Sequence, residues 1–282
     1  MRDASRHCVE GLGVLGGVLI RHRPVPVGYW FSMLSLVFPL GLRALVRMNG
    51  HTRGMKTLFL TGGSRGVGGA LADRLANSWN LIMLARNEER ASELEGRYPG
   101  CRTVITDLSD PKAAAASVAR SLENSGATID AFVSCAGVEG ATALESLEAG
   151  ALERIYAINV LSPVMLTNAL LPYLRESRGT VVFVGSTAAQ LTFPGWLPYS
   201  TSKAALEKAA SVLRAEERTL RVSTVTPGRI DTDMQRDMAA KQSREFDPAT
   251  AMSPASVAWA IQMALEAPSD VVVEQITVTP NR

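Results

Sequence analysis

A regular alternation of short apolar runs with helical patterns, from Thr57 onwards, constrains the fold of this chain most strongly. The runs are apolar nearly throughout, whereas a strand with one solvent-exposed face alternates apolar and polar residues. Such runs between helices are typical of a parallel sheet covered on both faces. The expected strands are 57–61, 81–85, 103–106, 130–135, 180–185, 221–226 and 271–278, and the expected helices include 111–122, 150–174 and 254–265. We therefore expect a single doubly wound α/β domain of about seven parallel strands, over about residues 55–282.

A glycine-rich turn follows the first expected strand. Its sequence from Thr61 to Gly68 is TGGSRGVG, and a helical pattern begins directly after it. Glycines let the backbone turn tightly and approach a pyrophosphate, and the helix N-terminus attracts the negative charge. The placement after an opening strand, more than the glycines themselves, predicts a dinucleotide site in a Rossmann-type domain.

The end of the second expected strand bears on which dinucleotide binds. Proteins that bind NAD usually place a carboxylate there, which holds the ribose hydroxyls. Here Ala85 is followed by Arg86 and Asn87, and Arg65 lies in the glycine-rich turn. Two guanidiniums suit the 2′-phosphate of NADP, so these residues favour NADP over NAD. The alternative, that Arg86 only begins a solvated helix, stays open at this point.

Ser186, Tyr199 and Lys203 form a candidate catalytic set. Ser186 follows the run 180–185, and Tyr199 and Lys203 are four residues apart on an expected helix, hence on one face. Because an ammonium beside a phenol stabilises phenolate, we expect Lys203 to lower the pKa of Tyr199. The alternative is a chance Tyr–Lys pair on a surface helix. All three histidines precede Met55, which excludes a Ser-His-Asp mechanism and a histidine metal site in the main domain, and no metal is expected.

Short motifs in a fixed order give the chain from Met55 to Arg282 a family resemblance. In chain order they are Thr61-Gly62-x-x-x-Gly66-x-Gly68, Asp107-Leu108, Ala136-Gly137, Asn159, Ser186, Tyr199-x-x-x-Lys203, Pro227-Gly228 and Thr232. The ordered set resembles the classical short-chain dehydrogenases/reductases over this whole length. The resemblance implies an oxidoreductase that uses NADP(H) to interconvert a carbonyl and a primary or secondary alcohol. It also implies a homodimer or homotetramer.

The resemblance implies a role for each matched residue. Tyr199 would be the general acid in reduction and the base in oxidation, Lys203 would hold the nicotinamide ribose, and Ser186 would orient the carbonyl. Asn159 would anchor a water molecule in a proton relay from Lys203. The expected cofactor-binding residues are Thr61, Gly62, Ser64, Arg65, Gly66, Val67, Gly68, Arg86, Asn87, Asp107, Leu108, Ala136, Gly137, Tyr199, Lys203, Pro227, Gly228, Ile230 and Thr232.

The sequence indicates the substrate less clearly than the cofactor. The candidate substrate residues are Val138, Leu191, Trp196 and Arg229, and Phe193 belongs to the same expected wall. The segment 231–251 would be a flap over the site. Two competing functions stay open: an NAD-linked alcohol dehydrogenase, which the residues after Ala85 disfavour, and a non-catalytic NADP-binding sensor protein.

The charges are divided unequally along the chain. Residues 1–54 hold seven arginines and two acids, so the remainder carries a net charge of −3 within a total of +2. A mildly acidic domain does not suit nucleic acid. Three scattered cysteines, Cys8, Cys101 and Cys135, indicate a reducing compartment, so we expect a cytoplasmic protein.

Residues 1–54 do not resemble the rest and are treated as an N-terminal extension. The stretch from Pro24 to Leu42 is uncharged over about 19 residues, which is borderline for a bilayer span. Met55 and Lys56 stand directly before the first strand, as a native start would. A disordered leader or a mis-called upstream start is the favoured interpretation. Association with a membrane through this extension and another targeting role are the alternatives.

Overall fold

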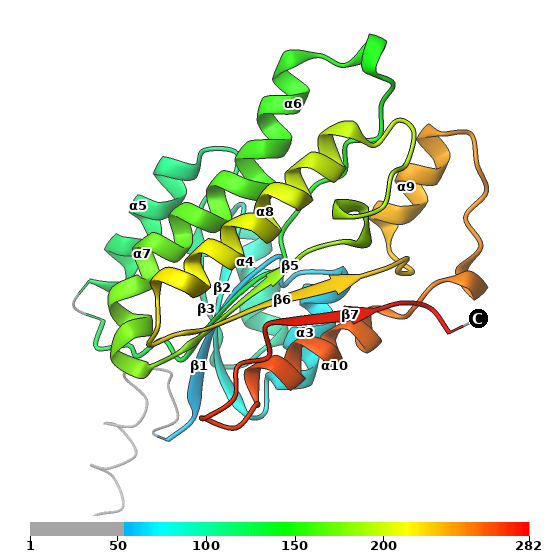
Figure 1. The fold of residues 1–282 in the computed structure, drawn as a ribbon. Helices are drawn as coiled ribbons and strands as arrows, with labels where there is room; N and C mark the ends of the chain where they lie inside the picture. The colour runs from blue at the N-terminus through cyan, green and yellow to red at the C-terminus, as the bar shows by residue number, and fades with distance from the viewer. Residues whose placement is uncertain (1–53, 124, 282) are drawn as a thin grey trace, which may run out of the picture. The chain divides into compact units, whose positions relative to one another are not determined.

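Seven parallel strands form the centre of the computed structural model, which describes residues 54–123 and 125–281 (Figure 1). The strands are β1 (Lys56–Thr61), β2 (Trp79–Ala85), β3 (Arg102–Ile105), β4 (Ala131–Ser134), β5 (Thr180–Val184), β6 (Arg221–Pro227) and β7 (Gln275–Val278). Their order in the sheet is β3-β2-β1-β4-β5-β6-β7. The strand order therefore reverses between β1 and β4, which confirms the predicted Rossmann-type doubly wound fold.

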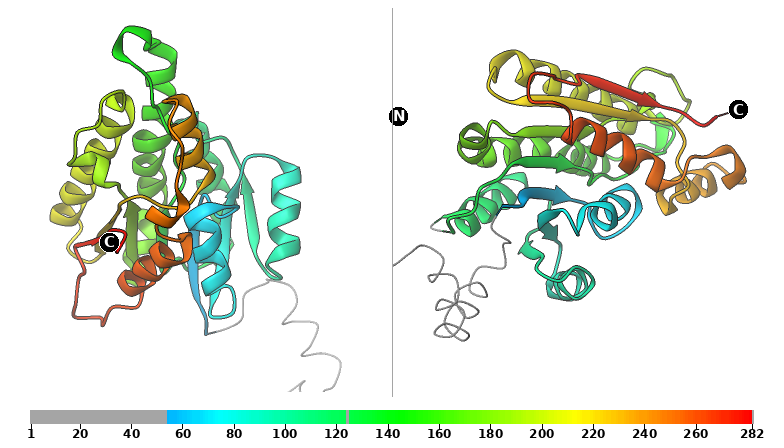
Figure 2. Two further views of the ribbon diagram at one scale, coloured as in Figure 1. Left: turned by 90° about the vertical axis from the view of Figure 1, so that its right-hand side faces the viewer. Right: turned by 90° about the horizontal axis from the view of Figure 1, so that it is seen from below.

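Helices cover both faces of the sheet (Figure 2). One face carries α3 (Gly66–Leu75), α4 (Glu88–Arg97) and α10 (Pro254–Leu265), and the other carries α5 (Pro111–Leu122), α7 (Ser162–Ser177) and α8 (Leu197–Glu216). Successive residues of a strand point to opposite faces, so Leu58 and Leu60 of β1 pack on the first face and Phe59 packs on the second. Both faces are buried, which explains why the strands are apolar throughout.

Local signals place the helix starts correctly. The Asp110 side chain accepts a hydrogen bond from the backbone N–H of Ala113 at 3.0 Å, and Pro111 is the first residue of α5. The Ser253 hydroxyl likewise accepts from the N–H of Ser256 at 3.2 Å at the start of α10. Such caps satisfy backbone donors that have no partner within the helix, so the predicted bounds of both helices are confirmed.

The long helix predicted over 150–174 has a π-helical turn inside it. It consists of α6 (Ala149–Tyr156), the π-helical turn η3 (Ala157–Leu161) and α7, without a break. By length and composition this stretch could cross a membrane, but half of its most apolar window is buried inside the protein, as in a core helix. Turns of this kind inside helices are frequent at functional sites, and η3 contains Asn159.

Two segments near the C-terminus differ from expectation. The last strand was predicted from Val271 but begins at Gln275, because the N–H of Val271 bonds the carbonyl of Pro268 in a turn. The predicted flap contains α9 (Asp233–Lys241) and the short 3₁₀ helix η5 (Pro248–Thr250). The predictions for the N-terminal extension fall outside the described residues, apart from Gly54.

Candidate active site

A cleft of about 690 Å³ lies at the carboxyl ends of the strands, around the point where the strand order reverses. Ligands of open α/β sheets bind at this edge. The predicted cofactor-binding residues that line it are Gly62, Ser64, Arg65, Gly66, Val67, Gly68, Arg86, Asn87, Asp107, Leu108, Ala136, Gly137, Tyr199, Lys203, Pro227, Gly228, Ile230 and Thr232. The structure thus brings together residues that are up to 170 positions apart in the chain.

Two glycines allow the turn after β1 to pack against the end of β4. Gly62 has a φ of +71°, and a Cβ there would lie 2.8 Å from the backbone nitrogen of Ala136. A Cβ on Gly68 would lie 2.2 Å from the carbonyl oxygen of Gly62. Glycine is therefore required at positions 62 and 68.

Thr61 lies beneath the cleft rather than in its lining, because its Oγ1 accepts from the N–H of Ala136 at 3.1 Å.

The start of α3 fits a diphosphate. Gly66, its first residue, has a φ of +58°, and a Cβ there would meet only Thr232, at 3.8 Å. Arg65, at the N-cap, makes no side-chain hydrogen bond to the helix. Backbone N–H groups therefore remain available toward the cleft, where the helix dipole also favours an anion. These residues suit a dinucleotide cofactor.

The stretch after β2 presents two cations to the cleft, with the carboxylate of Glu89 on α4 beside them. After Ala85, both Arg86 and Arg90 line the cleft, and Arg90 was not predicted. The side chain of Asn87 caps α4, since its Oδ1 accepts from the N–H of Arg90 at 2.9 Å. Asn87 can therefore offer a cofactor the donors of its Nδ2 and its backbone.

The guanidinium of Arg65 joins the glycine-rich turn to α9. Its Nη1 lies 3.4 Å from Oδ2 of Asp233, and both side chains are mostly exposed. An exposed pair at this distance is weak, so Arg65 is free to exchange Asp233 for another anion.

Asp107 follows β3 and lines the cleft as predicted. Its Oδ1 accepts from the backbone N–H of Ser109 at 2.8 Å, and this bond holds the pKa of Asp107 below its usual value. The carboxylate is therefore ionised at neutral pH. It can accept a hydrogen bond from an amino group such as that of adenine.

Ser186, Tyr199 and Lys203 meet in the same cleft. Ser186 lies two residues after the end of β5, and its Oγ accepts from the N–H of Ala188 at 3.1 Å at the start of the 3₁₀ turn η4 (Thr187–Ala189). Tyr199 and Lys203 lie one turn apart near the start of α8 and are both buried. The ammonium of Lys203 donates to the carbonyl of Val184 at 2.9 Å and lies 5.8 Å from the centre of the Tyr199 ring.

Burial dominates the acid–base properties of the set. It raises the pKa of Tyr199, which the Ser186 hydroxyl opposes by a hydrogen bond. Burial also lowers the pKa of Lys203 to about 8, while the charges of Cys135 and Glu207 act in the other direction. The expectation that Lys203 lowers the pKa of Tyr199 is therefore wrong for this structure, because loss of hydration outweighs the ammonium, which is directed at the backbone of β5.

Asn159 does not line the cleft but bonds the loop that does. It is fully buried in η3, and its amide bonds the N–H and the carbonyl of Val138, both at 2.9 Å, as well as Ser202 Oγ at 3.1 Å. Asn159 therefore positions the loop after β4, where Gly137 and Val138 line the cleft. Its part in a proton relay stays a prediction.

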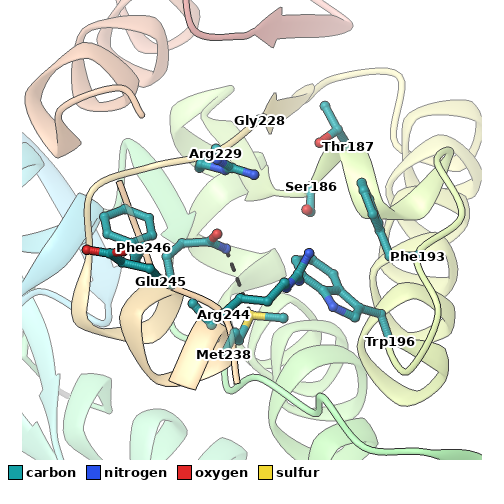
Figure 3. A pocket seen from close by; sticks show the side chains of 12 residues that line it. Ser186, Thr187, Phe193, Trp196, Gly228, Arg229, Met238, Arg244, Glu245 and Phe246 are labelled. Atoms are coloured by element: carbon teal, nitrogen blue, oxygen red, sulfur yellow. Dashed lines mark hydrogen bonds between the residues drawn. The ribbon is translucent and has the colours of Figure 1, made fainter. Parts of the chain in front are cut away.

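A smaller pocket of about 230 Å³ adjoins the cleft at Ser186 and Gly228 (Figure 3). Of the four candidate substrate residues, Trp196 and Arg229 line this pocket and Val138 lines the larger cleft. Leu191 lines neither and is 56% exposed.

Most of the other residues that line the smaller pocket were not predicted from the sequence. Besides Phe193, which was expected there, the lining comprises Thr187, Gln235, Met238, Ala239, Arg244, Glu245 and Phe246. All of these except Thr187 come from α9 or from the stretch that follows it up to Phe246, on the segment predicted as a flap. The flap was the only available signal, because no motif marks these positions.

A glycine-rich turn, a doubly wound sheet and a Ser–Tyr–Lys set on one cleft define the class of dinucleotide-binding α/β proteins. A family model described as short chain dehydrogenase matches residues 56–243. An uncharacterized oxidoreductase of Saccharomyces cerevisiae is 35% identical over 186 residues, which cover 64% of this chain and 72% of the relative. The NADP-dependent 3-hydroxy acid dehydrogenase of Schizosaccharomyces pombe is 30% identical over 241 residues, with 80% and 93% covered.

Solved structures agree with this assignment. The alcohol dehydrogenase of the archaeon Thermococcus sibiricus, complexed with 5-hydroxy-NADP, is 25% identical with a TM-score of 0.70, and the match covers 80% of this chain and 97% of that one. The chain belongs to the short-chain dehydrogenase family and is an oxidoreductase of that family. A nicotinamide cofactor is typical of its members.

Proposed function

We propose that the protein interconverts a carbonyl and a primary or secondary alcohol with NADP(H), with Tyr199 as the general acid/base. One observation carries the proposal: Ser186, Tyr199 and Lys203 line the same cleft as the glycine-rich turn. A proton donor and a dinucleotide cradle on one cleft suit hydride transfer coupled to proton transfer.

The residues of this chain would handle the oxygen of the substrate. Bound NADPH supplies the hydride. The Ser186 hydroxyl orients the carbonyl oxygen, and the Tyr199 hydroxyl donates a proton to it. Burial raises the pKa of Tyr199, so the phenol is protonated at neutral pH, which is the state that donation requires. With a pKa of about 8, Lys203 is largely charged at neutral pH, and its ammonium would hold the ribose of the nicotinamide.

NADP is the proposed cofactor because of the charges around the end of β2. Arg65, Arg86 and Arg90 line the cleft, whereas Ala85 stands where an NAD-binding protein usually has a carboxylate. A 2′-phosphate carries negative charge that guanidiniums bind well. The relatives that are described as NADP-dependent or were solved with 5-hydroxy-NADP support the same choice.

The proposal is tested with purified full-length protein, a panel of aldehydes and ketones, and the absorbance of NADPH. We expect turnover in the wild type. Tyr199→Phe should lower kcat by at least about 10²-fold and leave NADPH binding intact, because only the transferred proton is lost. Tyr173→Phe, on α7 outside the cleft, is the matched control and should behave as the wild type.

Each alternative has its own outcome. Protein that binds NADPH but reduces no carbonyl would be a binding protein. A lower KM for NADH than for NADPH would favour the NAD-linked dehydrogenase. Normal turnover in the Tyr199→Phe variant would refute the assigned mechanism.

A further inference from the structure

Two arginines stand in the pocket beside Ser186. Arg229 directly follows Gly228 after β6, and Arg244 follows α9. Figure 3 shows both guanidiniums directed into the space that Ser186 faces, one from the side of Gly228 and the other from beside Trp196. We propose that this pocket takes an oxo acid, a carbonyl substrate that also carries a carboxylate, and that Arg229 and Arg244 bind the carboxylate. The inference rests on the proposed function, because it names the substrate class of the same site.

Hydrogen-bond donors remain available on both guanidiniums. Arg229 donates one hydrogen bond, to Thr250 Oγ1 at 2.8 Å, and Arg244 donates to the side chain of Gln242. A guanidinium has five N–H donors in a fork that matches a carboxylate. Within residues 54–123 and 125–281, neither arginine takes part in an ion pair.

Nearby carboxylates on the neighbouring segments already have partners. Asp231 and Asp233 both pair with Arg236, and Glu139 pairs with Lys241. These acids therefore pair with other cations, and Arg229 and Arg244 keep their charge for a ligand.

Among the described residues that line the pocket, Glu245 is the one acid. In Figure 3 its carboxylate lies beside Phe246, on the far side of the pocket from Trp196. Together with the two arginines it leaves the lining with a net charge of +1, which matches a monoanion. A carboxylate fits that balance better than a phosphate dianion.

The remaining wall suits a short carbon chain. The rings of Phe193 and Trp196 are 4.8 Å apart, and Trp196 meets Tyr199 edge-on at 6.0 Å. Met238 supplies a further apolar surface. A volume of about 230 Å³ is below the roughly 300–1,000 Å³ of sites for drug-sized ligands. The substrate would therefore place its carbonyl at Ser186 and Tyr199, its chain along the aromatic wall, and its carboxylate at the arginines.

Matched acids and esters test the proposal. NADPH-dependent reduction of 3-oxobutanoate and 4-oxopentanoate is compared with that of their methyl esters, which lack the charge. We expect the wild type to prefer at least one acid to its ester by about tenfold or more in kcat/KM, because the charged groups of the pocket would form charge-assisted hydrogen bonds only with the acid. Equal kcat/KM for each acid and its ester would overturn the proposal.

Variants assign the preference to the two arginines. Arg229→Gln and Arg244→Gln should each lower kcat/KM for the preferred acid by about tenfold and affect its ester much less. Arg229→Lys should recover part of the loss, because it restores the charge without the fork. Arg120→Gln, on the exposed side of α5, is the control and should change neither rate. Equal losses on acid and ester would mean that the arginines act only on the fold.

A binding measurement separates this inference from the proposed function. Tyr199→Phe protein with NADP⁺ is titrated calorimetrically with 3-hydroxybutanoate and with its methyl ester, so no turnover is needed. Tighter binding of the acid that is lost in an added Arg244→Gln change supports the inference even if the wild type reduces no carbonyl. Reduction of the esters without any acid preference in rate or binding refutes the inference and leaves the proposed function intact.

Discussion

The side-chain amide of Asn159 bonds both backbone groups of Val138: Oδ1 accepts from its N–H and Nδ2 donates to its carbonyl, each at 2.9 Å. One buried side chain thereby replaces a strand partner for the loop that leaves β4. The same amide donates to Ser202 on α8, one position before Lys203. Asn159 therefore connects the loop at the cleft to the helix that carries the candidate catalytic groups.

Replacing this amide should cost stability as well as activity. Asn159→Leu keeps a similar volume but leaves the partly buried N–H and carbonyl of Val138 without their partner, at a cost of up to about 1–3 kcal/mol for each group. We expect a lower free energy of unfolding in urea and a lower kcat/KM. Asn168→Leu, on the exposed side of α7, should change stability by less than about 0.5 kcal/mol. Unchanged stability with reduced kcat would instead support a role for Asn159 in the proton relay alone.

Gly68 should not tolerate a methyl group. A Cβ there would lie 2.2 Å from the carbonyl oxygen of Gly62, and neither backbone can move without opening the turn. We expect Gly68→Ala to lower the melting temperature and to abolish NADPH binding, which fluorescence titration measures. The matched control is Gly96→Ala, at an exposed position of α4 where an added Cβ would meet no atom within 4 Å. It should stabilise the protein by up to about 1 kcal/mol, because alanine is the better helix former. Cofactor binding at wild-type strength in Gly68→Ala would show that the turn relaxes easily.

Lys203 should make stability depend on alkaline pH. Burial lowers its pKa from the ordinary value of 10.5, which applies to the unfolded chain, to about 8 in the folded protein. Between these two pH values the unfolded chain binds more protons, so the contribution of this group to the free energy of unfolding rises with pH. Below about pH 8 the folded state bears the cost of a buried ammonium.

The stability difference between wild type and Lys203→Met should therefore shift toward the wild type from pH 8 to pH 10, by up to about 3 kcal/mol. Tyrosines and other groups titrate in both proteins, so their contributions cancel when the free energy of unfolding of the variant is subtracted from that of the wild type. Urea denaturation at a series of pH values measures the difference. A difference that does not change with pH would mean that the ammonium remains hydrated.

Acidic replacements at the end of β2 and in the turn should change the cofactor preference. Arg65→Asp combined with Arg86→Asp would repel a 2′-phosphate and offer carboxylates to ribose hydroxyls. We expect the ratio of kcat/KM for NADPH over NADH to fall by at least about tenfold, or about 1.4 kcal/mol. Arg218→Asp, exposed beyond α8, is the control and should keep the ratio. An unchanged ratio in the double variant would assign the preference, if any, to other residues such as Arg90.

Features encoded over short stretches of chain were predictable. Apolar runs predicted the strands because both faces of a parallel sheet are buried, and Asp110 with Pro111 marked a helix start. Gly62 and Gly68 were recognisable from their spacing, since a turn that packs this tightly leaves no room for a side chain. The order of these motifs was sufficient to indicate the family.

Features that depend on the distance between remote groups required the folded chain. Nothing near Arg244 in the sequence shows that it lies in one pocket with Ser186, and no helical pattern shows that Asn159 bonds Val138. The pKa of Tyr199 was expected to fall because Lys203 is four residues away. It rises instead, because burial removes the water that would stabilise a phenolate and the ammonium bonds the backbone of β5. Spacing along the chain determines which residues share a helix face, whereas hydration and the direction of a charge are decided only when the whole domain packs.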